Sequence, residues 1–239
     1  MESVSAISYK ISSIPYLLRL KTPCALCRRL HHGKFSVCAF CENTLMPLGP
    51  ACTHCATPLF GTKALICGHC IKKKPTLDYV FAAYRFEEPL RTLLHDFKYR
   101  ENLHLGKFLI SLMQKSHADE PYQTECLIPV PTHKKRLQKR GFNHTVILAK
   151  HLAKQIQRPC LISHIQKIID TPSQAKLDAA ARRRNLQNTF QFKPLSYKHV
   201  TLVDDLITTG STANELAFQL KAQGVERVDL WCIAKTCLV

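Results

Sequence analysis

The sequence predicts an α/β fold in which a parallel sheet is flanked by helices and follows a small cysteine-rich unit. From residue 79 onward, short apolar runs alternate with segments of helical periodicity, which is the pattern of βα units. Before that point, eight of the twelve cysteines form four Cys-x-x-Cys pairs. A chain of 239 residues has room for one domain of about 150 residues and a smaller one.

We expect three parts: an N-terminal segment at 1–20, the cysteine-rich unit at 21–75 and the α/β domain at 76–239, with Pro75 marking the boundary. The first segment has isoleucines and leucines interrupted by polar residues, so it predicts an amphipathic start and not a signal peptide. No apolar run approaches the roughly 18 residues that a membrane-spanning helix needs.

The elements of the α/β domain follow from local patterns. The first helix, for example, places Leu90, Leu93, Leu94 and Phe97 on one face. In chain order we expect a strand at Tyr79–Arg85, helices at Pro89–Phe97 and Leu103–Met113, a strand at Leu127–Pro131, a helix from Gly141 to Gln155, a strand at Leu161–Ile169, a helix at Asp178–Leu186, strands at Phe190–Phe192 and Val200–Val203, a helix ending near Gln223 with Gly224 as its cap, and a strand at Val228–Ala234.

The four Cys-x-x-Cys pairs predict two structural zinc sites, a double zinc ribbon. No secretion signal is apparent, so metal binding is favoured over disulfides. Two knuckles supply the four thiolates of a tetrahedral site. Sequential pairing is the most economical, and an interleaved pairing stays open. The sequential ligand sets are Cys24, Cys27, Cys38 and Cys41 for one ion, and Cys52, Cys55, Cys67 and Cys70 for the other.

The formal net charge of +17 favours an anionic partner, either a polyphosphate or nucleic acid. Eight thiolates and two zinc dications together carry −4, which would leave +13. Part of the charge lies on the cysteine-rich unit, where Lys72, Lys73 and Lys74 form a run. This run could form a basic surface that binds nucleic acid, or it could be a solvated linker.

A strand, two acids, a hydroxyl-rich turn and a helix follow one another near the C-terminus. The apolar run Val200–Val203 leads directly into Asp204 and Asp205. The turn that follows consists of Thr208, Thr209, Gly210, Ser211 and Thr212. The backbone N–H groups and hydroxyls of this turn, with the N-terminus of the following helix, can bind one phosphate. The two acids can accept hydrogen bonds from ribose hydroxyls or from the water shell of a cation. The pattern predicts a site for a sugar phosphate with Mg²⁺.

A basic segment follows the strand at 127–131, and we expect it to be a loop. Residues 132–140 contain five Lys or Arg and no acid. At the end of a strand of the same sheet, such a loop could neutralise a diphosphate. The candidate residues are Thr132, His133, Lys134, Lys135, Arg136 and Arg140.

Four motifs in this order closely resemble the ComF family, which includes the competence protein ComFC and GntX-type proteins. They are the Cys-x-x-Cys pairs, Pro-Val-Pro with a basic segment ending Arg140-Gly141-Phe142-Asn143, Thr171-Pro172-Ser173-Gln174-x-x-Leu177 with Arg182 and Asn185, and Val203-Asp204-Asp205-x-x-Thr208-Thr209-Gly210-Ser211-Thr212. The resemblance covers about residues 20–238. The last motif is similar to the phosphoribosyl-diphosphate (PRPP) motif of type I phosphoribosyltransferases.

The resemblance implies a double zinc ribbon followed by a type I phosphoribosyltransferase domain. Asp204, Asp205 and the turn at 208–212 match the PRPP motif of the family. Residues 131–136 match its diphosphate-binding loop, and the segment through Arg140 matches the mobile loop that covers the site. Asp204 and Asp205 are then also the candidate catalytic residues. No role follows for Arg182 or Asn185.

The resemblance also implies a PRPP-binding protein of natural competence that acts on or with incoming single-stranded DNA during DNA uptake. Other DNA-uptake proteins are further candidate partners. A cytoplasmic location is expected, and association with the inner face of the membrane is left open. Two alternatives remain: a salvage enzyme that joins a free base to PRPP, and a non-catalytic nucleic-acid adaptor. The acceptor, turnover and oligomeric state do not follow from the sequence.

Overall fold

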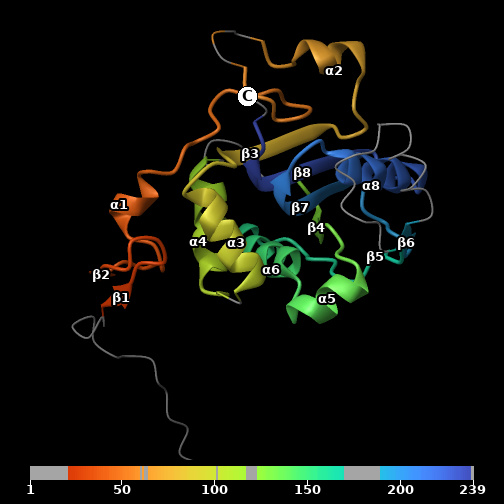
Figure 1. The fold of residues 1–239 in the computed structure, drawn as a ribbon. Coiled ribbons are helices and arrows are strands. Elements are labelled where there is room, and N and C mark those ends of the chain that lie inside the picture. Colours follow the sequence, from red (N-terminus) through yellow and green to blue (C-terminus); the bar gives the residue numbers. More distant parts are fainter. Residues whose placement is uncertain are drawn as a thin grey trace, which may run out of the picture.

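The computed structural model describes residues 21–59, 61, 64–100, 102–116, 123–169 and 189–237. Its centre is a four-stranded sheet of order β3-β8-β7-β4, in which all neighbouring strands are parallel (Figure 1). The strands are β3 (Tyr79–Arg85), β4 (Cys126–Pro129), β7 (His199–Ile207) and β8 (Arg227–Lys235). The predicted α/β class, with a parallel sheet and flanking helices, is confirmed.

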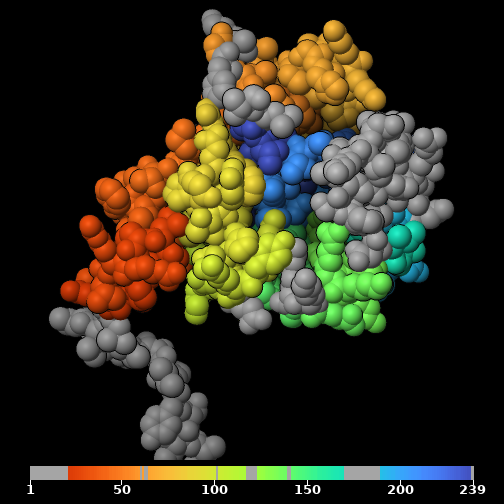
Figure 2. All heavy atoms as spheres, viewed as in Figure 1, coloured from red at the N-terminus to blue at the C-terminus, as the bar shows by residue number. Residues whose placement is uncertain are grey.

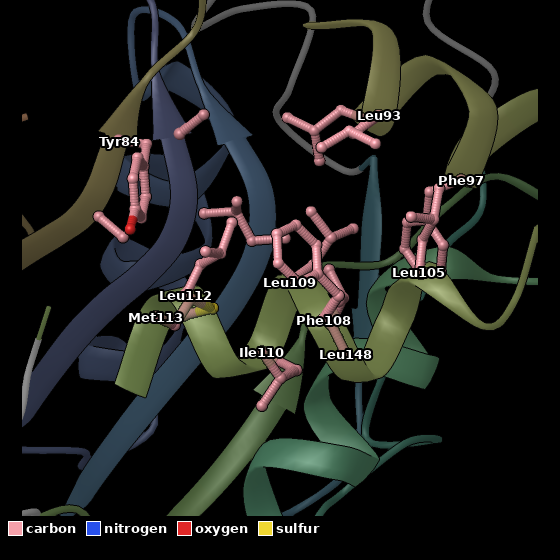
Figure 3. Packing of buried hydrophobic residues seen from close by; sticks show 14 of the residues in the cluster. Tyr84, Leu93, Phe97, Leu105, Phe108, Leu109, Ile110, Leu112, Met113 and Leu148 are labelled. Carbon is pink, nitrogen blue, oxygen red and sulfur yellow. The ribbon is translucent and has the colours of Figure 1, made fainter. Parts of the chain in front are cut away.

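Helices cover both faces of this sheet. One face packs against α3 (Leu90–Tyr99), α4 (Leu105–Ser116) and α6 (His144–Ile156), and the other against α8 (Ser211–Ala222). Figure 3 shows the first core, where Phe108, Leu109 and Leu112 of α4 are fully buried. Residues of β7 alternate between the cores, as a central strand requires: Leu202 belongs to one core and Val203 to the other.

Besides β7, which is described with the site below, two predicted segments differ from expectation. The basic segment after β4 is a short helix, α5 (Lys134–Arg140), and not a loop. The strand predicted at Leu161–Ile169 is reduced to β5 (Ile165–Lys167), which pairs antiparallel with β6 (Phe190–Phe192) outside the main sheet. Leu161 instead donates its backbone N–H to the Leu127 carbonyl, and the chain turns before β5 begins.

The cysteine-rich unit packs on the α/β part at two separate places. Its elements are β1 (Thr22–Pro23), β2 (Leu30–His31), α1 (Ala39–Glu42) and α2 (Gly68–Lys72). Cys24, Val37, Cys41 and Leu45 share the core of α3 and α4. Figures 1 and 2 show this first half beside α4, whereas α2 lies above β3.

The segment between the two halves follows the outer side of β3. Arg85 donates its N–H to the Met46 carbonyl, Leu48 to the Ala83 carbonyl and Val80 to the Thr53 carbonyl. The chain from Met46 to Thr53 therefore lies along most of β3 and leads into the second half of the unit.

Several predictions lie outside the described residues. They are the segment 1–20, the motif at Thr171–Leu177, the helix at Asp178–Leu186, and Arg182 and Asn185. Within the part of the chain that the structure describes, we find no helix with the length and apolar character needed to cross a membrane.

Candidate functional site

The acidic pair lies inside β7 and not after it. The sequence placed Asp204 and Asp205 at the end of the strand, but Asp204 still pairs with Cys232 and Ile207 with Lys235. The prediction was wrong because β8 continues alongside β7 to Ile207. On the opposite side, β4 ends at Pro129, which pairs with Val203. The two acids are therefore the first residues of β7 beyond the end of β4.

The hydroxyl turn joins β7 to α8, as predicted. Gly210 has φ +72° and caps α8, a conformation that an L-residue rarely adopts. Thr208 and Thr209 are exposed, and the Thr209 hydroxyl lies 2.8 Å from that of Ser211. Ser211 and Thr212 form the first turn of α8, so the turn and the positive end of the helix dipole coincide.

A lysine that the sequence analysis missed supports this turn. The nearly buried Lys235 donates from Nζ to the Thr208 carbonyl. Burial lowers the pKa of its ammonium. Since the predicted last strand ended at Ala234, one residue early, Lys235 was not considered. It adds a positive charge beside the proposed phosphate turn.

Asp205 is paired with two groups from the helices on one face of the sheet. Its Oδ2 is in ion-pair contact with Nζ of Lys98 near the end of α3. Its Oδ1 lies 3.3 Å from Nε2 of His144, the first residue of α6. Asp205 is 3% exposed, whereas Asp204 is half-buried and its Oδ1 accepts from the Asp205 N–H at 2.9 Å.

The two carboxyl groups titrate in opposite directions. Burial opposes ionisation of Asp205, but the charge of Lys98 and the contact with His144 hold its pKa well below the ordinary value. Burial and the neighbouring charge of Asp205 raise the pKa of Asp204 well above its ordinary value. The pair thus has one firmly ionised member and one that binds a proton readily.

The sequence analysis gave Lys98 and His144 no role in the site, although the sequence contained a signal for both. Lys98 lies four residues after the buried Leu94, on the apolar face of its helix. His144 lies four residues before the buried Leu148. A charged or titratable residue on an apolar stripe requires a buried partner.

The basic segment leaves the sheet at the same end as the acidic pair, because β4 and β7 are adjacent and parallel. It forms α5, capped by His133, whose Nδ1 accepts from the Lys135 N–H at 3.2 Å, and ended by Gly141 at φ +75°. Lys134 and Lys135 are exposed, and Thr132 and Arg136 are half-buried. For Arg140 only the backbone is described.

The eight paired cysteines form two clusters of four, in the sequential pairing. In each cluster the four Sγ atoms lie within 4.8 Å of one another. Cys27 Sγ is 3.8 Å from Cys38 Sγ, and Cys55 Sγ is 3.7 Å from Cys67 Sγ. A zinc tetrahedron with Zn–S bonds of about 2.3 Å has edges of about 3.8 Å. The clusters therefore fit structural zinc, and four thiolates each leave no open coordination position.

Backbone N–H groups point at the sulfur atoms, as expected where thiolates carry charge. The Cys38 N–H donates to Cys24 Sγ at 3.4 Å, and the Cys67 N–H to Cys52 Sγ at 3.3 Å. Burial works against ionisation of Cys24, yet such donors lower its pKa to about 6. The sequence-predicted ligands are thus brought together, and a cation would complete both clusters.

Comparison with known proteins gives close relatives over most of the chain. Competence protein F of Haemophilus influenzae is 33% identical over 222 residues, covering 89% of this chain and 96% of that protein. DNA utilization protein YhgH of Escherichia coli O157:H7 is 30% identical over 220 residues, with the same coverage. Competence protein ComFC of Bacillus subtilis is 25% identical over 201 residues, covering 79% of each chain.

No family model matches the chain. A crystal structure of adenine phosphoribosyltransferase covers 59% of this chain and 74% of its own, with 12% identity and a TM-score of 0.34, a level that carries no argument about function. The first two relatives show the family of this chain, because they are at least 30% identical to it and their similarity covers 89% of this chain and 96% of their own length. The chain belongs to the ComF family, together with competence protein F and DNA utilization protein YhgH.

Proposed function

We propose that this protein binds PRPP at the end of β7 and acts on or with incoming single-stranded DNA during DNA uptake and transformation. The observation that supports PRPP binding is a single arrangement: an acidic pair, a hydroxyl turn at a helix N-terminus and a basic helix all meet at one end of the sheet. The names of its relatives, which speak of competence and DNA utilization, support the second half.

In this proposal the 5-phosphate lies in the turn at 208–212, where the N-terminus of α8 and the nearby Lys235 favour an anion. Asp204, the less constrained acid, accepts from the ribose hydroxyls, and Asp205 supports it from the buried side. Lys134, Lys135 and Arg136, with Thr132, His133 and Arg140, would face the diphosphate. Their positive charge would stabilise a departing diphosphate.

Mg²⁺ is the metal we propose for the bound substrate. Carboxylate and phosphate oxygens are its usual ligands. When bound, the ion would neutralise part of the negative charge of the diphosphate. The eight cysteines hold structural zinc and take no part in the reaction.

Two further functions compete with this proposal. A salvage enzyme that joins a free base to PRPP would use the same ribose and phosphate groups, but it would have little use for a net charge of +17 or a zinc-binding unit. A non-catalytic nucleic-acid adaptor would use the charge, but it would have no reason to keep the acidic pair and the hydroxyl turn together.

Calorimetric titration of the zinc-loaded protein with PRPP and Mg²⁺ tests the proposed site. Wild type should bind PRPP, and the double variant Asp204→Asn with Asp205→Asn should not. Glu226→Gln removes an exposed carboxylate that precedes β8, at the opposite end of the sheet from the site, and is the matched control. Equal PRPP affinity in the double variant and wild type would refute the assignment.

Two experiments separate the three functions. Fluorescence anisotropy with single-stranded DNA separates the salvage enzyme from the others, since binding through about four phosphates should weaken about fifty-fold from about 50 to about 200 mM salt. Diphosphate release from PRPP, measured with and without single-stranded DNA or free bases, separates turnover from binding alone.

A further inference from the structure

The acidic pair in β7 already holds a cation that belongs to the chain. Nζ of Lys98 contacts Asp205 Oδ2, and the side chains of these residues are 19% and 5% exposed. The other oxygen of Asp205 faces Nε2 of His144, whose side chain is 7% exposed. Both oxygens of one acid are thus occupied by groups from helices remote in sequence.

This contact is fixed by packing. Lys98 follows the buried Phe97 of α3, and the ring of Phe97 meets the His144 ring edge to face, with centroids 6.5 Å apart and an interplanar angle of 88°. Asn143 caps α6 by accepting from the Thr145 N–H at 3.1 Å, which fixes the start of the helix on which His144 lies. Lys98 and His144 are therefore held on rigid elements and not on loops.

The same groups would otherwise suit a divalent metal. His144, Asp204 and Asp205 each offer one ligand atom, and these atoms lie within 4.8 Å of one another. One imidazole and two carboxylates are a donor set that Mn²⁺ and similar ions accept. A metal at this place would have to share Asp205 with the ammonium of Lys98, and the two positive charges would repel each other.

We infer that Lys98 occupies, at Asp205, the place that a divalent cation would otherwise take among His144, Asp204 and Asp205. Asp205 is then a positioning residue locked to the protein, and Asp204 is the carboxylate left for a ligand. This inference deepens the proposed function and rests on it only where PRPP is concerned. For PRPP it implies that Mg²⁺ would enter the site with the diphosphate and would not be bound by Asp205.

The charges at the site agree with this arrangement. Burial alone would lower the pKa of the Lys98 ammonium, yet attraction to Asp205 and Asp204 raises it above its ordinary value. Lys98 is therefore a permanent cation at neutral pH. The ammonium of Lys98 therefore neutralises at least half of the negative charge of Asp204 and Asp205 before any ligand binds.

Binding of Mn²⁺ to the zinc-loaded full chain tests the inference without PRPP. Free Mn²⁺ gives a six-line paramagnetic resonance signal that is lost on binding. Wild type should leave the signal unchanged, whereas Lys98→Met should remove about one equivalent per chain. Lys107→Met, which removes an exposed lysine from α4, is the control and should behave as wild type. Adding Asp204→Asn to Lys98→Met should abolish the new site.

Lys98→Gln provides a second variant if Lys98→Met does not fold, because the amide removes the charge and keeps a hydrogen-bonding head. Mn²⁺ should raise the thermal midpoint of either folded variant by several degrees and leave that of wild type unchanged. Wild type that binds one Mn²⁺ through Asp204 would overturn the inference, and so would a folded Lys98 variant that binds none. Failure of wild type to bind PRPP would refute the proposed function and leave this result untouched.

Discussion

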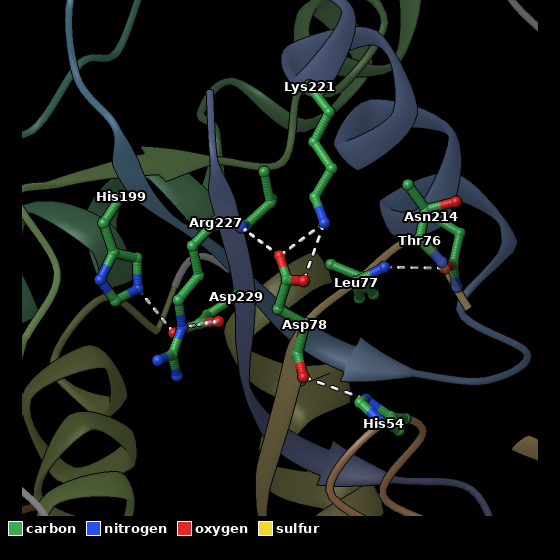
Figure 4. A network of polar contacts seen from close by, with 10 residues as sticks. His54, Thr76, Leu77, Asp78, His199, Asn214, Lys221, Arg227 and Asp229 are labelled. Atoms are coloured by element: carbon green, nitrogen blue, oxygen red, sulfur yellow. Dashed lines mark hydrogen bonds and ion pairs between the residues drawn. The ribbon is translucent and has the colours of Figure 1, made fainter. Parts of the chain in front are cut away.

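The side-chain oxygen of Asn214 accepts hydrogen bonds from the backbone N–H groups of both Thr76 and Leu77, at 2.8 and 3.2 Å (Figure 4). Its amide nitrogen donates to the Gly210 carbonyl at 3.1 Å. One residue in the first turn of α8 therefore joins the chain that leaves the cysteine-rich unit to the hydroxyl turn.

We expect Asn214→Ala to weaken both stability and ligand binding. Two backbone N–H groups lose their acceptor, which should lower the free energy of unfolding by about 2 kcal/mol. PRPP affinity should fall because the Gly210 turn loses a partner. Urea unfolding and calorimetry measure the two effects. Asn214→Asp keeps the acceptor, replaces the donor to Gly210 by an oxygen and adds a negative charge near the turn, so it should retain most of the stability and still bind PRPP more weakly.

Gln219→Ala is the control for this experiment, since Gln219 lies on the same helix and bonds only to Glu215 in the described structure. If Asn214→Ala and Gln219→Ala have the same PRPP affinity, Asn214 does not organise the turn.

The two aspartates should respond to mutation in opposite ways. Asp205→Asn breaks a buried ion pair with Lys98 and should lower the free energy of unfolding by about 3 kcal/mol. Asp204→Asn removes a carboxyl group whose pKa is raised by burial and by Asp205, so it should leave the protein equally or more stable. Thermal unfolding at pH 7 separates the two. A larger loss for Asp204→Asn than for Asp205→Asn would contradict the assigned roles.

The pH dependence of stability should carry the signature of Asp205. Its folded pKa lies below that of the unfolded chain, where the pKa of Asp is about 3.9, so the unfolded state binds more protons in acid. The contribution of Asp205 is thus complete above the unfolded pKa and is lost as the pH falls through that value toward the folded one. Asp204 acts oppositely: its stabilising contribution is present at low pH and is lost as the pH rises through its raised folded pKa.

Urea unfolding between pH 3 and pH 7 measures this dependence. Wild type should lose more stability than Asp205→Asn as the pH falls below about 4, since the variant has no carboxyl group to protonate. Parallel curves for the two proteins would show that the pair with Lys98 contributes nothing.

Metal analysis should find two zinc ions per chain. Cys41→Ser should retain one, because the other cluster shares no ligand with it. The loss should also loosen α4, since Cys24 and Cys41 belong to the same core as Phe108 and Leu109. The fully buried Cys126 belongs to neither cluster, so Cys126→Ser should retain two. One zinc ion in wild type would refute the assignment of structural zinc to both clusters.

The sequence predicted what depends on local pattern and missed what depends on distant contacts. The bounds of β3 follow from an apolar run and those of β6 from the alternation Phe-Gln-Phe, and both were predicted correctly. The end of β7 was misplaced because the polar Asp204 and Asp205 resemble the end of a strand, whereas β8 alongside keeps them in the sheet.

The candidate site shows the same division. The turn at 208–212 is contiguous, so it could be recognised from spacing alone. Lys98 comes from α3, and only the packing of α3 against α6 brings its ammonium to Asp205. The basic segment was predicted to be a loop because the prediction relied on its run of charges. It did not consider that His133 and Gly141 could cap a short helix there. Ion pairs between remote helices leave no contiguous motif.

The hydrogen bonds along the outer side of β3 have a consequence for how other molecules can dock. Residues 46–53 occupy the free side of β3, and Pro159 and Leu161 exchange backbone hydrogen bonds with Leu127 on the free side of β4. In the described part of the chain both margins of the central sheet are thus occupied in part by the chain's own backbone. At these residues another molecule cannot add a strand to the sheet by β-augmentation, and the same cover protects them from edge-to-edge aggregation.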